Sequence, residues 1–359
     1  MRYLDKGDFF RHGALLARTV TPYLSPVKLG NLIRCEWEWL GRVTRPQSFP
    51  YMAILDITNA CNLRCPFCPT GARRDSGRRQ RFLPVDLVRK LLDEVGSYLI
   101  SAVLFNWGEP LLHPQLPEIV RLFHQNRIFT SVSSSLNIAS PDVLAALCEA
   151  GLDHLVISVS GASQEVYEKY HRKGQLQLLL DNLKFVTDYK CRHHLGNPVI
   201  EIKYLVFSFN RHEVEAAAHL TKLLGADLFL RVAGGGSPEL EVSPANKSPR
   251  INSFLALQPC NQLWQTVVLN TNGGVAPCCY TYFQAQDLGN FSQGTLRKIR
   301  LNEKFTNARS LFNLRRFRDL PPHLQHPCLQ CHLVHAQPHL QRYLDQNPHA
   351  DKGHRTGGP

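Results

Sequence analysis

Apolar and polar positions alternate along residues 51–233 in a way that predicts a repeating order of strands and helices. Short apolar runs, suited to buried strands, are followed by segments in which apolar residues recur every three or four positions. The runs that we expect to be strands are 52–57, 102–107, 128–133, 154–160, 199–207 and 227–233. The segments that we expect to be helices are 86–98, 115–126, 141–150, 164–189 and 212–224. This order predicts a parallel sheet with right-handed crossovers, either doubly wound or curved into a barrel.

Residues 1–49 show a different pattern, with short amphipathic stretches near 9–16 and 29–40 that are interrupted by prolines. We expect a helical extension packed on the main domain, since Glu36 and Glu38 interrupt the apolar stripe. The alternative is contact with a membrane surface, because apolar and basic residues are neighbours here. These residues are Ile33, Trp37, Trp39 and Leu40, beside Lys28, Arg34 and Arg42.

Three cysteines lie on one short loop directly after the first predicted strand. Cys61, Cys65 and Cys68 are separated by three and then two residues. A [4Fe-4S] cube takes a ligand on each iron, so three close cysteines leave one iron open to a non-protein ligand. Zinc sites usually combine paired Cys-x2-Cys elements, and the spacing here therefore favours an iron–sulfur cluster over zinc.

A Gly-Glu-Pro turn ends the second predicted strand, at Gly108, Glu109 and Pro110. Gly108 would let the backbone approach a ligand closely, and Pro110 stiffens the exit from the turn. With the three cysteines, this turn resembles the radical S-adenosylmethionine (SAM) superfamily, and the resemblance covers about residues 50–236.

The resemblance implies an α/β fold, a partial (β/α)6 barrel with its site at the carboxyl ends of the strands. It implies that the open iron binds SAM, whose reductive cleavage gives a 5′-deoxyadenosyl radical that abstracts a hydrogen atom. It further implies that Gly108, Glu109 and Pro110 help to bind SAM. Strand-end residues in family positions for SAM or substrate are Ser133, Ser135, Ser158, Ser160, Lys203 and Arg231. A serine at a strand end also simply caps a helix, so both interpretations stand for the serines.

A second set of cysteines follows residue 258. Residues 237–258 are rich in proline and polar residues and are expected to be a linker. The residues that follow have the pattern of a β-hairpin. The apolar stretch Thr266–Asn270 leads into the turn Asn272-Gly273-Gly274, and Val275–Cys279 come after it. Four thiols that could complete a cube come from Cys260, Cys278, Cys328 and Cys331.

This arrangement resembles the Twitch and SPASM domains of radical SAM enzymes, and the 2-deoxy-scyllo-inosamine dehydrogenase type of cysteine spacing in particular. The resemblance implies a small α+β domain at 259–335 with one auxiliary [4Fe-4S] cluster. A zinc site made of the same four cysteines is the alternative. Cys279 either replaces Cys278 as a ligand, stands near the substrate as a catalytic acid–base group or hydrogen donor, or is a buried structural thiol.

Composition indicates the cellular compartment in which we expect the protein. The eleven cysteines are grouped at metal-ligand spacings, which fits a reducing compartment better than disulfides. No apolar run approaches the ~18 to 20 residues needed to cross a bilayer, so we expect a cytoplasmic protein. Residues 336–359 are polar and rich in histidine, and we expect them to be disordered.

The formal net charge of +12 points to an anionic substrate. Arginines concentrate directly after the three-cysteine loop, at Arg73, Arg74, Arg78, Arg79 and Arg81. The guanidinium fork suits phosphate and carboxylate oxygens, whereas the plainer interpretation is a solvated basic loop.

We therefore expect a radical SAM oxidoreductase acting on an unactivated C–H bond of an anionic small molecule, such as a sugar, nucleotide-sugar or lipid head group. Its reducing partner would be a flavodoxin or ferredoxin. The closest alternative is a peptide maturase. Many of these enzymes carry a separate leader-binding domain, and the extension of about 50 residues is too short and too helical to be one. A non-enzymatic metal protein that binds RNA through its charge is the alternative of another class, and nothing resembles a nucleic-acid-binding module.

Overall fold

The computed structural model describes residues 20–138, 141–233, 259–321 and 324–346, and one continuous sheet runs through these ranges. Its strand order is β6-β5-β4-β3-β2-β1-β7-β8-β9. The bounds of the strands are β1 Met52–Leu55, β2 Ser101–Val103, β3 Phe129–Ser134, β4 His154–Val159, β5 Val199–Val206, β6 Leu228–Ala233, β7 Thr266–Leu269, β8 Gly274–Ala276 and β9 Gly289–Asn290.

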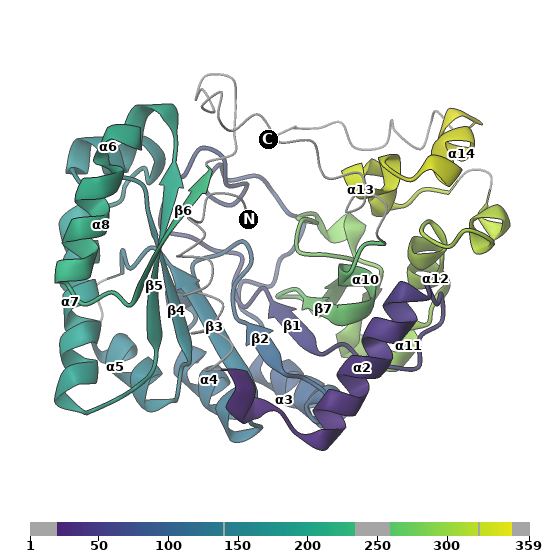
Figure 1. Ribbon diagram of the computed structural model, residues 1–359, viewed down its shortest axis with the longest axis horizontal. Coiled ribbons are helices and arrows are strands. Elements are labelled where there is room, and N and C mark those ends of the chain that lie inside the picture. Colours follow the sequence, from purple (N-terminus) through teal and green to yellow (C-terminus); the bar gives the residue numbers. More distant parts are fainter. Residues whose placement is uncertain (1–19, 139–140, 234–258, 322–323, 347–359) are drawn as a thin grey trace.

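Strands β1 to β6 are parallel to their neighbours and form an open, curved sheet. Helices cover its outer side, as Figure 1 shows. The bounds of the helices along this part of the chain are α3 Val85–Val95, α4 Leu116–Gln125, α5 Pro141–Glu149, α6 Gln164–Tyr170, α7 Leu176–Arg192 and α8 Val214–Leu223. This is the α/β partial barrel that the resemblance implied, and β1 to β6 lie at the places that the apolar pattern predicted.

One predicted helix is wrong. The apolar spacing over 164–189 predicted a single helix, but the structure has two, α6 and α7, separated at 171–175. Lys173 adopts a left-handed backbone conformation there, with φ 68°, which an α-helix does not contain. The apolar positions continue across this break, and periodicity alone therefore did not reveal it.

The predicted hairpin is confirmed as β7 and β8, which pair antiparallel across a turn where Gly273 has φ 78°. Its position in the sheet was not predicted. Strand β7 pairs parallel with β1, from Met52 opposite Thr266 to Leu55 opposite Leu269. The strand that precedes the first cysteine set is thus hydrogen-bonded to the strand that follows Cys260.

The N-terminal part contains α2, Pro26–Leu40, which begins after the Ser25 N-cap. It packs against α10, Gln262–Gln265, and Cys35 Sγ lies 3.4 Å from the Trp264 carbonyl oxygen. The stretch at 9–16 and the expected linker at 237–258 lie outside the described residues.

The remaining helices lie toward the C-terminal end and are α11 Leu296–Arg300, α12 Glu303–Ser310, α13 His332–His335 and α14 Gln341–Gln346. The expectation of a disordered tail from residue 336 is wrong as far as residue 346. Leu340 is fully buried, and Tyr343 Oη donates to the Pro321 carbonyl oxygen over 2.6 Å. In the described ranges, the helices are all too short or too polar to cross a membrane.

Candidate active site and auxiliary cluster site

The cysteine loop, residues 59–71, leaves the carboxyl end of β1 and is fixed by backbone contacts. Thr58 pairs with Phe82 as an isolated bridge. The Asn59 side chain donates to the carbonyl oxygens of Arg78 and Gln80 over 3.0 and 3.1 Å. The segment after the loop therefore returns alongside its start, which holds the three cysteines beside the strand ends.

Two glycines allow the loop to pack as tightly as it does. A Cβ atom on Gly108 would lie 1.9 Å from the Thr58 carbonyl oxygen, and one on Gly71 would lie 2.6 Å from the Cys65 carbonyl oxygen. The close approach expected at Gly108 is thus to the cysteine loop of the protein itself. Gly71 was not singled out from the sequence, although a glycine three residues after Cys68 is the signal that could have found it.

The three thiols of the loop influence one another. Burial raises the pKa of Cys61 to about 11 and also raises that of Cys65, and the neighbouring thiols add to both shifts. Each pKa belongs to the metal-free thiol, whereas iron binds the thiolate and favours its deprotonation. The Phe67 ring of this loop contacts the rings of Tyr170 and Phe207, which also contact each other.

Glu109 is buried, and both of its carboxylate oxygens accept hydrogen bonds. Its carboxylate accepts from the Ser134 hydroxyl over 2.7 Å and from the Ser135 backbone N–H and hydroxyl, both over 3.0 Å. Burial raises its pKa, and these hydrogen bonds oppose the rise. Ser135, expected at the cofactor, is therefore joined to Glu109. Pro110 is also buried and begins the turn Pro110–Leu112.

The other strand-end residues do not all come together. Ser133, Ser158 and Lys203 share the inner face of the sheet, since Ser133 is in register with Val156 and Ser158 with Lys203. Arg231 lies on the helix-covered side, beside Tyr204, and its guanidinium is 2.6 Å from Glu215 of α8.

Ser160 is buried and bonded within the protein. Its hydroxyl donates to the Tyr167 carbonyl oxygen over 3.2 Å and lies 2.6 Å from His171 Nδ1. Burial lowers the pKa of His171 to about 3, so this ring is neutral. Ser160 thus has a structural role between β4 and α6.

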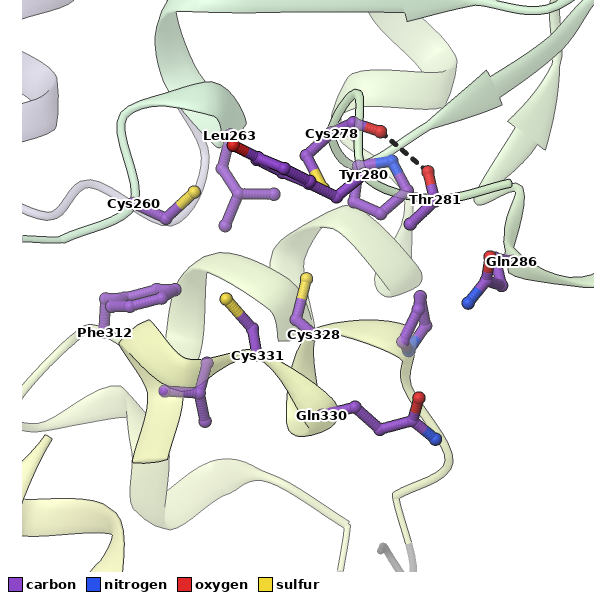
Figure 2. Close-up of a pocket in the computed structure, with 13 residues that line it drawn as sticks. Cys260, Leu263, Cys278, Tyr280, Thr281, Gln286, Phe312, Cys328, Gln330 and Cys331 are labelled. Atoms are coloured by element: carbon purple, nitrogen blue, oxygen red, sulfur yellow. Dashed lines mark hydrogen bonds between the residues drawn. The ribbon is translucent and has the colours of Figure 1, made fainter. Parts of the chain in front are cut away.

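The second cysteine set lines one cavity of about 480 Å³. Figure 2 shows Cys260 and Cys278 on one side of this cavity and Cys328 and Cys331 on the other. Burial raises the pKa of Cys260 to about 11 and that of Cys278 to about 12, with contributions from the neighbouring thiols. The cavity also contacts apolar and aromatic residues such as Leu263 and Phe312.

Hydrogen bonds between nearby residues position these cysteines. Cys328 lies in the 3₁₀ turn Pro327–Gln330 and Cys331 follows it, so that the Cys331 N–H donates to the Cys328 carbonyl oxygen over 3.0 Å. The His326 ring accepts from the Cys328 N–H over 3.1 Å. On the other side, the Thr281 hydroxyl donates to the Cys278 carbonyl oxygen over 2.7 Å, as drawn in Figure 2.

Cys279 is not among the residues that line this cavity. It packs against Ile54, Val268 and Ala276, on the inner face of β1, β7 and β8. The structure therefore separates the two adjacent cysteines, with Cys278 toward the other three thiols and Cys279 toward the inside of the curved sheet.

Trp107 connects the two cysteine sets. Its backbone N–H donates to Asp56 over 3.0 Å, and its carbonyl oxygen lies 3.9 Å from Cys68 Sγ. Its indole N–H donates to the Thr281 carbonyl oxygen over 3.3 Å. Trp107 was not singled out from the sequence, although its place directly before Gly108 marks it.

The arginine loop, residues 73–81, is held against the segment that contains Tyr282 and Asp287. Arg78 is buried, with its guanidinium 2.7 Å from Asp287, and it also donates to the Tyr282 carbonyl oxygen. The Tyr282 hydroxyl donates to the Arg74 carbonyl oxygen over 2.7 Å. Arg78 is therefore a structural residue, whereas the side chains of Arg73, Arg74, Arg79 and Arg81 are exposed.

Both cysteine sets suit iron–sulfur ligation by their donor chemistry. Three thiols share one loop, and four thiols share one cavity. Across the described residues, no three His, Cys, Asp or Glu side chains are arranged to hold a single metal ion. A [4Fe-4S] cluster differs from such a site, because each thiolate binds a different iron.

Comparison with protein families gives two matches. Residues 55–220 match the radical SAM superfamily, and residues 260–332 match the SPASM iron–sulfur cluster-binding domain. The two matches contain the first and the second cysteine set, respectively.

Curated relatives match part of the chain. A PqqA peptide cyclase of Rhodopseudomonas palustris is 30% identical over 129 residues, which are 36% of this chain and 34% of that protein. A GTP 3′,8-cyclase of Chlorobaculum tepidum is 30% identical over 173 residues, 46% of this chain and 48% of that protein. The chain thus spans between about a third and a half of these two relatives.

Among solved structures, native anSMEcpe with bound AdoMet and Cp18Cys peptide has a TM-score of 0.52 at 14% identity. The matched region covers 74% of this chain and 84% of the anSMEcpe chain. At this identity, the likeness concerns the fold.

Proposed function

We propose that this chain, which matches the radical SAM superfamily over residues 55–220 and the SPASM iron–sulfur cluster-binding domain over residues 260–332, abstracts a hydrogen atom from an unactivated C–H bond of its substrate. The observation that carries the proposal is the three-thiol loop at the carboxyl end of β1, packed against Gly108. That end of the strands is where folds of this kind bind ligands. We propose residues 50–236 as the SAM-binding domain and 259–335 as the auxiliary domain.

The cofactors supply the chemistry and the protein positions them. A [4Fe-4S] cluster with bound SAM supplies, on one-electron reduction, a 5′-deoxyadenosyl radical. We propose that Cys61, Cys65 and Cys68 hold this cluster. Glu109, fixed by Ser134 and Ser135, shapes the SAM side of the site, while Phe67 and its aromatic neighbours limit access of water.

The auxiliary cluster would be held by Cys260, Cys278, Cys328 and Cys331. We propose that it accepts an electron from the substrate radical or orients the substrate, which would make the net reaction an oxidation. A flavodoxin or ferredoxin in a reducing compartment would supply the electron for SAM cleavage.

The test is an anaerobic assay. The protein is reconstituted with iron and sulfide, reduced, and given SAM, while 5′-deoxyadenosine and iron are measured. We expect about eight irons per chain and formation of 5′-deoxyadenosine. Cys61→Ala should abolish SAM cleavage while keeping about four irons in the auxiliary site. Cys191→Ala, at an exposed cysteine outside both sets, is the control. Unchanged cleavage in the Cys61 variant would exclude the assigned cluster.

For the substrate, we propose an anionic small molecule, such as a sugar phosphate, a nucleotide-sugar or a lipid head group. The support is four exposed arginines, Arg73, Arg74, Arg79 and Arg81, on a loop that follows Cys68 in the chain and contacts Tyr282. Arg78 does not contribute, because its charge is opposed by Asp287.

UDP-glucose and glycerol 3-phosphate are suitable anionic probes, and glucose is the neutral one. We expect the two anionic probes to bind and glucose not to bind. Replacing the four exposed arginines by glutamine should reduce the affinity for the anionic probes at least about tenfold. Equal affinity of the variant and the unchanged protein would exclude the arginine loop as the binding site.

A peptide substrate is the second candidate, and two of the compared proteins support it. One relative is named as a peptide cyclase, and the structural neighbour holds a peptide. Peptide-dependent stimulation of 5′-deoxyadenosine formation, without stimulation by anionic small molecules, would select this alternative.

A further inference from the structure

Helix α2 carries an exposed apolar stripe, and three polar side chains are among those that it buries. Its buried residues are Lys28, Asn31, Cys35 and Glu38. Its outer stripe, defined as Leu29, Ile33, Trp37 and Leu40, is exposed. An ordinary surface helix turns its apolar stripe toward the core, so the exposed stripe of α2 is unusual.

Specific hydrogen bonds fix this orientation. The Asn31 side chain donates to and accepts from the Phe49 backbone, over 2.9 Å in each direction. Glu38 accepts from the backbone N–H groups of Gln47 and Ser48 over 2.9 and 3.0 Å. Turning the helix to bury the outer stripe would break these bonds, and leaving Glu38 without them in the interior would be strongly unfavourable.

The outer stripe is continuous and large. Its members are spaced by four, four and three residues, which places them on one helix face. Ile33, Trp37 and Leu40 are 60%, 78% and 62% exposed. Of the nine exposed large apolar residues in the described ranges, five lie in α2, so exposed apolar surface is concentrated here.

The charges that border the outer stripe are basic. Arg34 is exposed on α2, and Arg45 is exposed shortly after the helix. At the end of α2, the Arg42 carbonyl oxygen accepts from Asn313 over 2.9 Å, which brings a second basic segment to this edge. That segment continues with exposed Leu314, Arg315, Arg316 and Arg318, and Asp319 is its acidic exception. Glu36 faces the protein, where it accepts from Tyr51 and Gln265.

We propose that the outer stripe docks this protein on an anionic membrane surface. An interfacial helix buries an apolar face in the headgroup region while its basic neighbours attract anionic lipids, and tryptophan favours that region. The chain carries a net charge of +12, which complements such a surface and opposes association with a second copy through the same basic face.

The outer stripe contains no cysteine of either set, and its test requires no catalysis. The cluster-loaded full chain is sedimented with vesicles of equal parts phosphatidylcholine and phosphatidylglycerol, and separately with phosphatidylcholine alone. We expect binding to the anionic vesicles, weakened by salt. The Ile33→Gln, Trp37→Gln double variant should bind at least about tenfold more weakly. Leu223→Gln changes an equally exposed apolar residue on α8 and should bind like the unchanged chain.

Three results would overturn the proposal. The first is no binding of the unchanged chain to anionic vesicles. The second is unchanged binding of a folded double variant, which would leave charge alone as the cause. The third is a concentration-dependent dimer, seen by sedimentation without vesicles and abolished in the double variant, which would assign the stripe to a second copy. Unchanged iron content and far-ultraviolet circular dichroism will establish that the double variant is folded.

Discussion

The Arg78 guanidinium donates to the Asp287 carboxylate over 2.7 Å, and both side chains are buried. The two residues are 209 positions apart. Arg78 follows the first cysteine set, whereas Asp287 lies between the members of the second. The ion pair therefore joins the two parts of the protein that are proposed to carry clusters.

Arg78→Ala should destabilise the protein. Removing one member of a buried pair leaves the other charge without a partner, which costs about 3–5 kcal/mol. We expect a lower melting temperature and a lower iron content after reconstitution. The matched control is Arg79→Ala, because Arg79 is the exposed neighbour. Equal melting temperatures for the two variants would contradict the structural role of Arg78.

Gly108→Ala should displace the cysteine loop. The added methyl group would meet the Thr58 carbonyl oxygen at 1.9 Å, so the backbone has to move. Forced overpacking costs about 1–3 kcal/mol. We expect a folded protein with 5′-deoxyadenosine formation reduced at least about tenfold.

Gly30→Ala is the control for this change, because a Cβ at Gly30 meets nothing within 4 Å. It lies within α2, where alanine is favoured over glycine by roughly 0.5–1 kcal/mol. A Gly108→Ala protein as active as Gly30→Ala would show that the loop tolerates the displacement.

The Cys278→Ala and Cys279→Ala variants should differ in the amount of iron that they bind. Cys278 lines the four-cysteine cavity and Cys279 packs outside it. After reconstitution, Cys278→Ala should bind about four irons, and Cys279→Ala should keep about eight. The reverse result would assign Cys279 as the ligand. Lost turnover with about eight irons in Cys279→Ala would support its proposed catalytic role.

Asp56 should make stability depend on pH. Burial raises the pKa of this carboxyl group to about 6, and the Trp107 N–H opposes the rise. The folded protein therefore binds the proton more tightly than the unfolded chain does. The contribution of Asp56 to the free energy of unfolding is therefore greatest below about pH 4, the pKa of this group in the unfolded chain. It falls by roughly 3 kcal/mol between pH 4 and about 6 and stays at the lower value above that.

Asp56→Asn keeps an acceptor for the Trp107 N–H and removes the titration. The variant should gain melting temperature relative to the unchanged protein at pH 7.5 and gain less at pH 5. Asp93→Asn, at an exposed aspartate of α3, serves as the control. An equal difference at both pH values would argue against a raised Asp56 pKa.

Local patterns predicted the strands, the hairpin and the grouping of cysteines, because each depends on a few neighbouring residues. Contacts between distant segments were not predictable in this way. The Arg78–Asp287 pair and the pairing of β1 with β7 join residues more than two hundred positions apart, and no local spacing encodes them. Arg231 shows a finer difficulty, since shifting a strand residue by one position moves its side chain to the other face.

The pairing of β1 with β7 also limits how this chain can be divided. A fragment that ends at residue 233 would lose β7, and β1 would become an edge strand with unpaired N–H and C=O groups. The apolar residues of β1, including Ala53 and Leu55, are buried in the whole protein. An exposed apolar edge strand promotes aggregation, so the two halves are best expressed as one polypeptide.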